Sequence, residues 1–580
     1  MKEHDQLSIR DTLLAANDAG TLLETLAATA YEEVDPVAST ISDMHNRDEI
    51  DIFAAFEPQR LEAANNQSFF ALRHVFCKAL PQTNCSADVA VAACESMYDK
   101  AGHDGAAGLV YDSLTNWFRK DPRRVEKGLV LVRQDLDAER RLVKPVLLAG
   151  ASHDATMSSE EAFDLSNQTQ MHIRLDAFWA LGRVVPTEDG RLLTRALDRL
   201  DQVMETPGSD NDAAHALEAA LHLLHRTDGN ILQRVEALLL KACTAPMPET
   251  VYTLAFGLQT RRNIYSQAMI DATFSVLQRT GKQDLRTILA IDSILYQWDL
   301  DGDRQRVLAF LIQLLGHSDD AIEITRLSDF RHRLGNEHGA VLGWYIVSLL
   351  LTGDFRLCQA ASQLLPYNET RDGLDIDLSP FSLTSPWILY LSRKILGYCI
   401  VNKESAAALL LSCLRAVPDT ERSELEDLVR DRFLMNYLTA MEWFQAAVSS
   451  NDPAQKSVQR LSQSMRSYVT ELDKAGICSA FRPNERERQL EAYRLGDFVR
   501  KVRRKAEEAS IFSSILHKST MLYGTASIAY IYRDDSGHPE RQEISLGSFE
   551  HAAEIPRLEV MDPVGLHYAI SRFRSEPPPS

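Results

Sequence analysis

Apolar residues recur at three- and four-residue spacing along most of this chain, and polar connectors break the pattern at intervals of roughly 15 to 20 residues. Because a helix turns once in about 3.6 residues, this spacing places apolar side chains on one helical face. Residues 288–298 carry one such stripe and residues 307–314 carry the next, with Gly316 placed to end the second helix. The pattern therefore predicts pairs of amphipathic helices joined by tight turns.

The predicted pairs repeat. Their first helices are expected to start near residues 170, 212, 249, 284 and 320, a spacing of roughly 35 to 42 residues that is typical of an α-solenoid. Residues 173–182, with the sequence IRLDAFWALG, resemble a helix of the HEAT-repeat family, in which Arg, then Ala, then Ala-Leu-Gly occur at these offsets. The resemblance implies stacked antiparallel helix pairs, with small residues allowing the helices of a pair to pack closely. A tetratricopeptide repeat fits less well, because the spacing from Gly353 to Pro366 is too short for that family.

The predicted fold class is mostly α: a HEAT-like α-solenoid of antiparallel helix pairs with a small C-terminal α+β module, a β-hairpin plus a helix. Residues 152–170 are polar and turn-prone, so we expect a connector there. The predicted regions are an N-terminal helical region over 1–150, HEAT-like repeats over 170–365, an acidic loop over 366–386, a helical continuation over 387–475, a long amphipathic basic helix over 484–520 and the C-terminal module over 523–576.

The C-terminal module is predicted from a change of period. Residues 526–532 and 544–546 alternate apolar and polar positions, as strands do, and Asp562-Pro563 is a typical helix start. We expect the hairpin residues Ile528, Tyr530, Ile544 and Leu546 to pack on the last helix through Phe573 and on the long helix through Phe498 and Phe512.

Composition and charge narrow the function classes. Gly and Pro number 26 and 21 of 580 residues, which favours helix over turn-rich β architecture, and the net charge is −20. Basic and acidic residues balance within 481–580, so the acidic excess lies in residues 1–480 and disfavours nucleic-acid binding by the body.

The eight cysteines are scattered without a C-x-x-C pair, which indicates thiols in a reducing compartment. The N-terminus has no apolar signal-peptide core, and the longest apolar run, residues 340–351, is too short to cross a bilayer, so we expect a soluble cytoplasmic protein with no membrane partner.

Two groups of residues suggest metal binding. His74 followed by His103-Asp104 is similar to the start of an HD-type phosphohydrolase, but His103-Asp104 lies in a predicted connector rather than at a helix end. A second group falls on one side of a single predicted helix, where we expect it to form an ordinary polar face: His215, Glu218, His222 and His225. The first group lacks a downstream Asp motif and the second is interpreted as a polar helix face, so we predict no metal and no cofactor.

Two charged segments are the candidate binding sites. One is a basic run on the long helix: Arg500, Lys501, Arg503, Arg504 and Lys505. The other is the acidic loop: Glu369, Asp372, Asp375 and Asp377. No nucleotide-binding or hydrolase motif occurs, so we do not expect an enzyme. We expect a protein-binding scaffold or adaptor whose C-terminal module docks an unidentified protein. The alternatives are a nucleic-acid-handling repeat protein that uses the basic helix, and an accessory subunit of a multi-protein bacterial system. The oligomeric state is left open.

Overall fold

The structure is a computed structural model of the whole chain, and it forms two compact units, Met1–Asn336 and Glu337–Ser580. The residues that it describes are 3–58, 61, 66–101, 108–134, 136, 141–206, 208–224, 229–316, 320–336, 339–365, 374, 376–476, 484–509, 526–531, 540–545 and 556–579.

The first unit is helical throughout its described residues. Its N-terminal helices are α1 (Glu3–Asp18), α2 (Leu22–Ala27), α3 (Val34–Asn46), α4 (Ile52–Ala55), α6 (Asn66–Ala79), α7 (Ala87–Ala101), α8 (Gly108–Phe118), α9 (Pro122–Gln134), α10 (Val143–Ala151) and α11 (Ala155–Leu165). Its later helices are α12 (Met171–Val184), α13 (Gly190–Glu205), α14 (Asp210–Leu224), α15 (Gly229–Thr244), α16 (Pro248–Arg261), α17 (Gln267–Leu277), α18 (Leu285–Gln297), α19 (Arg304–Gly316) and α20 (Ser328–Asn336).

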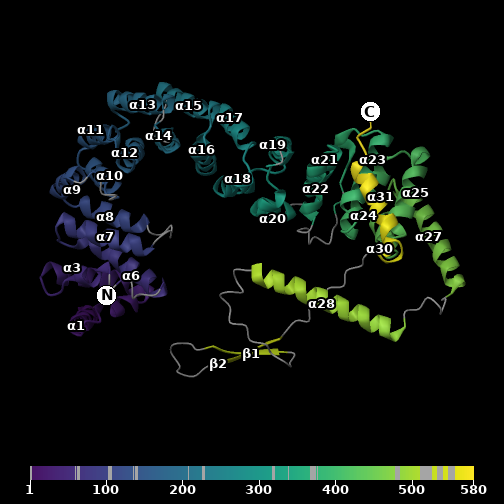
Figure 1. Ribbon diagram of the computed structural model, residues 1–580, viewed down its shortest axis with the longest axis horizontal. Helices are drawn as coiled ribbons and strands as arrows, with labels where there is room; N and C mark the ends of the chain where they lie inside the picture. The colour runs from purple at the N-terminus through teal and green to yellow at the C-terminus, as the bar shows by residue number, and fades with distance from the viewer. Residues whose placement is uncertain are drawn as a thin grey trace. The chain divides into compact units, whose positions relative to one another are not determined.

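The later helices of this unit form two layers. From α12 to α20, each even-numbered helix packs on the next one of this series, and α15 packs on both α13 and α17 in a second layer (Figure 1). The core lies between the layers, where Leu217, Leu258 and Ile291 are almost fully buried. Alternation of two layers of stacked helices is the architecture of a helical repeat array.

One close helix contact lies between repeats rather than within a pair. A Cβ atom added to Gly182 of α12 would lie 2.6 Å from the carbonyl oxygen of Ala219 in α14. The glycine therefore allows two neighbouring helices of one layer to approach each other, and the expectation that these small residues serve the helices of a pair is wrong.

The second unit continues the helical pattern. Its elements are α21 (Gly339–Leu351), α22 (Phe355–Leu364), α23 (Ser385–Tyr398), α24 (Lys403–Ala416), α25 (Ser423–Val429), α26 (Ala440–Ala447), α27 (Gln455–Ala475), α28 (Glu485–Ala509), β1 (Ala526–Ile531), β2 (Glu540–Ser545), α30 (Arg557–Met561) and α31 (Pro563–Ser575).

An arginine–aspartate contact of similar sequence separation occurs in each unit. Arg174 of α12 donates to Asp212 of α14, 38 residues later, over 2.8 Å. Arg415, near the end of α24, donates to Asp452 in the connector before α27, 37 residues later, over 2.7 Å. Each contact joins segments about one repeat length apart, as expected for a helical repeat fold.

The predicted helix starts are confirmed for four repeats, because α12, α14, α16 and α18 begin at Met171, Asp210, Pro248 and Leu285. The start predicted near residue 320 is wrong, since α20 begins at Ser328. Asp292 of α18 sets this start: its carboxylate accepts hydrogen bonds from the backbone N–H groups of Asp329 and Phe330 at 3.0 and 2.8 Å. A cap supplied by another helix leaves no local sequence signal.

The connector predicted over residues 152–170 is also wrong, because α11 forms within it. Asp154 caps this helix by accepting a hydrogen bond from the N–H of Met157 at 2.9 Å. Ala162, Phe163 and Leu165 are buried, and α11 packs on α10 and α12. Tertiary burial of a few apolar residues thus stabilises a helix in a stretch whose composition is polar.

The predicted fold class is wrong in its C-terminal part, because the hairpin and the last helix do not form an α+β module. Strands β1 and β2 pair antiparallel, from Ala526 opposite Ser545 to Ile531 opposite Glu540, and no other described strand joins them. Helix α31, which carries Phe573, packs on α23 and belongs to the helical body (Figure 1). The fold is a helical array, and the last helix is part of it.

Candidate protein-binding surface

Helix α28 is the longest described helix. Asn484 and Glu487 start it as a capping box: the side chain of Asn484 accepts from the N–H of Glu487, and the side chain of Glu487 accepts from the N–H of Asn484, both over 2.9 Å. It forms no packing interface with any other element among the described residues. The local sequence alone therefore accounts for the helix start.

The apolar face of α28 is exposed to solvent. Leu495 and Phe498 are each 64% exposed, and Val499 and Val502 are at least half exposed. The expectation that Phe498 packs within a C-terminal module is therefore wrong; Phe512 and Leu546 lie outside the described residues. Large apolar side chains clustered on one exposed face are typical of a surface that binds another protein.

The predicted basic residues lie on α28 beside an internal acidic partner. Asp497 pairs with Lys501 at 2.8 Å and with Arg500 at 3.9 Å, and the hydrogen bond from Lys501 lowers the pKa of the Asp497 carboxyl. Arg504 and Lys505 are exposed, and the backbone of Arg503 lies in the helix. The basic run is thus partly neutralised within the helix that carries it.

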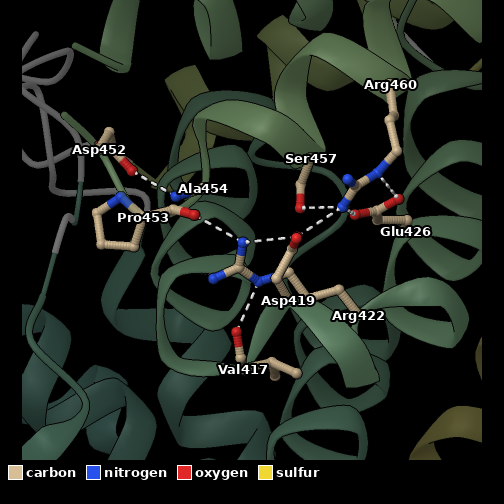
Figure 2. Close-up of polar contacts among 9 residues, drawn as sticks. All are labelled: Val417, Asp419, Arg422, Glu426, Asp452, Pro453, Ala454, Ser457 and Arg460. Atoms are coloured by element: carbon tan, nitrogen blue, oxygen red, sulfur yellow. Dashed lines mark hydrogen bonds and ion pairs between the residues drawn. The ribbon is translucent and has the colours of Figure 1, made fainter. Parts of the chain in front are cut away.

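Helix α27, which precedes α28, is anchored to the body by a polar network at its first turns (Figure 2). Arg460 of α27 donates to Glu426 of α25 at 2.5 Å and to Asp419 at 2.9 Å. Asp419 also lies 3.4 Å from Arg422, a buried side chain that donates to the carbonyl oxygen of Pro453 at 2.6 Å. Beyond residue 466 the helix is mostly exposed, so the network holds one end of α27 while the other end leads to α28.

A second exposed surface, which the sequence interpretation missed, lies on α16 and α18. We call it the α16–α18 patch: Tyr252, Phe256, Leu285, Arg286, Leu289 and Tyr296. The rings of Tyr252 and Phe256 stack with centroids 6.1 Å apart, and the guanidinium carbon of Arg286 lies 4.4 Å from the centre of the Tyr252 ring. Leu289 is 65% exposed. The missed signal is that α18 carries apolar residues on two faces, one for the core and one for this patch.

The acidic loop is described at one of its four predicted residues. Asp377 is exposed, and its carboxylate accepts from the N–H of Ser379 at 2.9 Å and from the Ser379 hydroxyl at 2.6 Å. The Ser379 hydrogen bonds lower the pKa of Asp377. Its role in the structure is to form a local turn. Glu369, Asp372 and Asp375 lie outside the described residues.

The structure places the predicted histidines in ordinary helix contacts. His215 Nδ1 lies 3.0 Å from the carbonyl oxygen of Asn211, and His222 Nδ1 lies 3.2 Å from that of Gly182. Glu218 pairs with Arg183 at 3.0 Å, and His225 lies outside the described residues. Within the described ranges no three His, Cys, Asp or Glu side chains gather as metal ligands.

His74 lies on α6, and its ring contacts the ring of Phe70 with centroids 4.7 Å apart. Burial and the neighbouring cations of Arg73 and Lys78 lower the pKa of His74. His103 and Asp104, its proposed companions, lie outside the described residues.

A cleft of about 810 Å³ opens in the first unit between residues 45–55 and 84–89. Two of its polar side chains have partners within the protein: His45 Nδ1 lies 3.2 Å from the carbonyl oxygen of Ile50, and Glu49 pairs with Arg10. Burial raises the pKa of the Cys85 thiol in this cleft to about 11. This thiol is therefore protonated near neutral pH and is a poor nucleophile.

No helix among the described residues has the length and apolarity needed to span a membrane. No protein-family model matches the sequence, and no curated protein matches it either.

Proposed function

We propose that this chain is a non-enzymatic protein-binding scaffold or adaptor of the cytoplasm, and that α28 in its C-terminal part is the specific docking element. The observation that carries the proposal is the exposed apolar face of α28, with Leu495 and Phe498 each 64% exposed on a helix that packs on no other described element. An amphipathic helix of this kind typically binds by laying its apolar face into a groove of its partner.

The charge of α28 indicates the chemistry of the partner. Arg500, Lys501, Arg504 and Lys505 lie within six residues of one another, so the groove that receives the apolar face is acidic at its rim. Complementary charge speeds association and fixes the register of the helix. The α16–α18 patch supplies a second surface with aromatic and arginine side chains, which are common at the centres of protein interfaces.

The test is affinity purification of the full-length chain from its native cells with quantitative mass spectrometry. Leu495→Glu with Phe498→Glu removes the apolar face, whereas Gln489→Glu adds a charge to the same exposed helix outside that face. Burial of two large apolar side chains contributes about 3–6 kcal/mol, so the double variant is expected to lose its partner by about 100-fold or more. The control variant retains the partner.

The same partner at full yield in the double variant contradicts the docking role of α28. Duplex DNA provides the second arm of the test, because the basic run is the one feature that favours the nucleic-acid alternative. Binding of DNA by the full-length chain at about 150 mM salt, lost on reversal of Arg500 and Arg504, contradicts the protein-binding proposal and supports that alternative.

A further inference from the structure

The C-terminal segment, residues 556–579, is held by a set of residues far away in the sequence. At its start, the carbonyl oxygen of Asn436 accepts from the N–H of Arg557 at 3.0 Å, and the side-chain oxygen of Asn436 accepts from the N–H of Leu558 at 3.1 Å. Asn436 is fully buried. One buried residue thus accepts hydrogen bonds from two consecutive backbone donors, through its backbone carbonyl and its side-chain oxygen, which requires a fixed position of the segment.

The other end of the segment is recognised by α23. Arg574 donates to the carbonyl oxygen of Gly397 at 2.6 Å, and the buried ammonium of Lys394 donates to the carbonyl oxygen of Arg574 at 2.7 Å. Arg393 closes the site by an ion pair with Glu576 at 2.7 Å. Burial lowers the pKa of Lys394, so the carbonyl that it contacts compensates part of the cost of its burial.

Two glycines make room for the segment. A Cβ atom at Gly353 would lie 2.8 Å from Pro578 Cγ, and one at Gly397 would lie 3.3 Å from Phe573 Cβ. Gly353 also has a φ of +71°, which favours glycine on its own account. We call this set of residues the docking site: Gly353, Arg393, Lys394, Gly397 and Asn436.

The contacts between the docking site and the segment do not involve α28 or the strands, which precede the segment in the chain. Within the described residues, neither α28 nor the strands pack on α30 or α31. Residues 510–555, which include β1 and β2, separate α28 from the segment. The contacts of the segment itself, rather than those of its neighbours in the chain, therefore hold it at the docking site.

The docked segment leaves an apolar surface uncovered beside the contact with α23. Leu566 is buried, but Val560, Met561, Val564 and Tyr568 are each more than two-thirds exposed, Val564 by 78%. Such a patch is typical of a surface that another molecule covers. It adjoins the α23 contact, so a second copy that joins through this contact is brought next to it.

The docked state also carries a cost. The phenol hydroxyls of Tyr390 and Tyr398 are buried without a hydrogen-bond partner among the described residues. Tyr390 and Pro578 both border Gly353, and Tyr398 faces Arg574, with the guanidinium carbon 5.1 Å from the ring centre. Departure of the segment returns these hydroxyls to water, which favours exchange.

We propose that the segment 556–579 is exchangeable and that the docking site accepts the same segment from a second copy of this chain. Exchange of an identical element between copies preserves every contact described above and needs no new interface chemistry. The partner of this surface is therefore the chain itself, independently of the partner of α28.

The first experiment measures binding in trans. Full-length chain with Leu566→Asp, which weakens its own segment, is mixed with a fluorescent peptide of residues 556–580, and anisotropy reports binding. The peptide is expected to bind, and Arg393→Glu in the chain is expected to weaken it about tenfold, because like charges then face each other at Glu576. A peptide with Glu576→Arg restores the affinity for the Arg393→Glu chain. Should Leu566→Asp change the circular dichroism, Glu576→Arg in the chain serves as the variant with an open site.

The second experiment tests the second copy itself. The chain with Leu566→Asp, an open site, is mixed with full-length Arg393→Glu, whose own segment is mismatched and free to leave. Light scattering after size exclusion is expected to show twice the chain mass. The control adds Glu576→Arg to the second chain, which restores its contact in cis and removes the dimer.

No binding of the peptide to the open site, or no rescue by the reversed pair, overturns the proposal and makes the segment a permanent cap of the helical body. Peptide binding without a dimer in the mixture overturns the second copy as the occupant. Neither result bears on the α28 surface, since the variants leave α28 unchanged.

Discussion

Arg422 and Arg460 share Asp419 as a partner, but burial makes their expected contributions to stability very different (Figure 2). Arg422 is 5% exposed and donates to the carbonyl oxygens of Val417 and Pro453, both at 2.6 Å. The side chain of Arg460 is 47% exposed. We predict that Arg422→Met strongly destabilises the second unit and that Arg460→Met does not.

The magnitudes follow from these contacts. Arg422→Met leaves the carbonyl oxygens of Val417 and Pro453 without their donor, but only the Val417 contact is buried, since Pro453 is exposed. The expected loss from the buried acceptor is about 1–3 kcal/mol. Arg460→Met removes partly exposed ion pairs with Glu426 and Asp419, and about 1 kcal/mol or less is expected. The Met side chain keeps the aliphatic stem in both variants, which makes the comparison one of polar contacts.

The assay is urea unfolding of the full-length chain followed by circular dichroism, with hydrogen exchange to assign the change to residues 417–465. Arg422→Met is expected to lower the midpoint and to raise exchange in α25 and α27. An effect of Arg460→Met equal to or larger than that of Arg422→Met refutes the argument that burial of the arginine decides the magnitude.

Three further predictions test the rest of the fold. Gly182→Val is expected to destabilise the first unit by about 1–3 kcal/mol or more, because the valine side chain would meet the backbone of α14. The control is Gly190→Ala, which is expected to leave the melting temperature nearly unchanged because the space around Gly190 is open. Burial raises the pKa of Asp212, but hydrogen bonds from its arginine and serine partners outweigh burial, so the net effect lowers this pKa below 3.8. The stability that the carboxylate contributes is therefore present above about pH 4 and is lost as the pH falls. Replacement by Asn should flatten that part of the stability–pH curve; an unchanged curve contradicts the assignment. Burial raises the pKa values of Cys399 and Cys413 to about 12, so both thiols should resist iodoacetamide at pH 8 until urea unfolds the chain, as mass spectrometry of the labelled peptides would report.

The helical repeat was readable from the sequence because its signal is local. Apolar spacing near 3.6 residues marks a helix wherever it lies, so the starts of α12, α14, α16 and α18 were predicted to within a few residues. Local signals also explain the break between α1 and α2, where Gly20 adopts a φ of +72°.

Only the tertiary structure shows which element, if any, packs against each apolar helix face. The stripe on α28 predicted a buried helix, yet Phe498 is exposed, because periodicity shows that a face is apolar and not what covers it. Phe573 was assigned to a hairpin nearby in the sequence, yet its helix packs on α23, nearly two hundred residues earlier. The start of α20 likewise depends on a carboxylate of α18. Contacts of this kind join residues far apart in the chain, so their free energy exists only in the assembled fold and leaves no pattern within any short stretch of sequence.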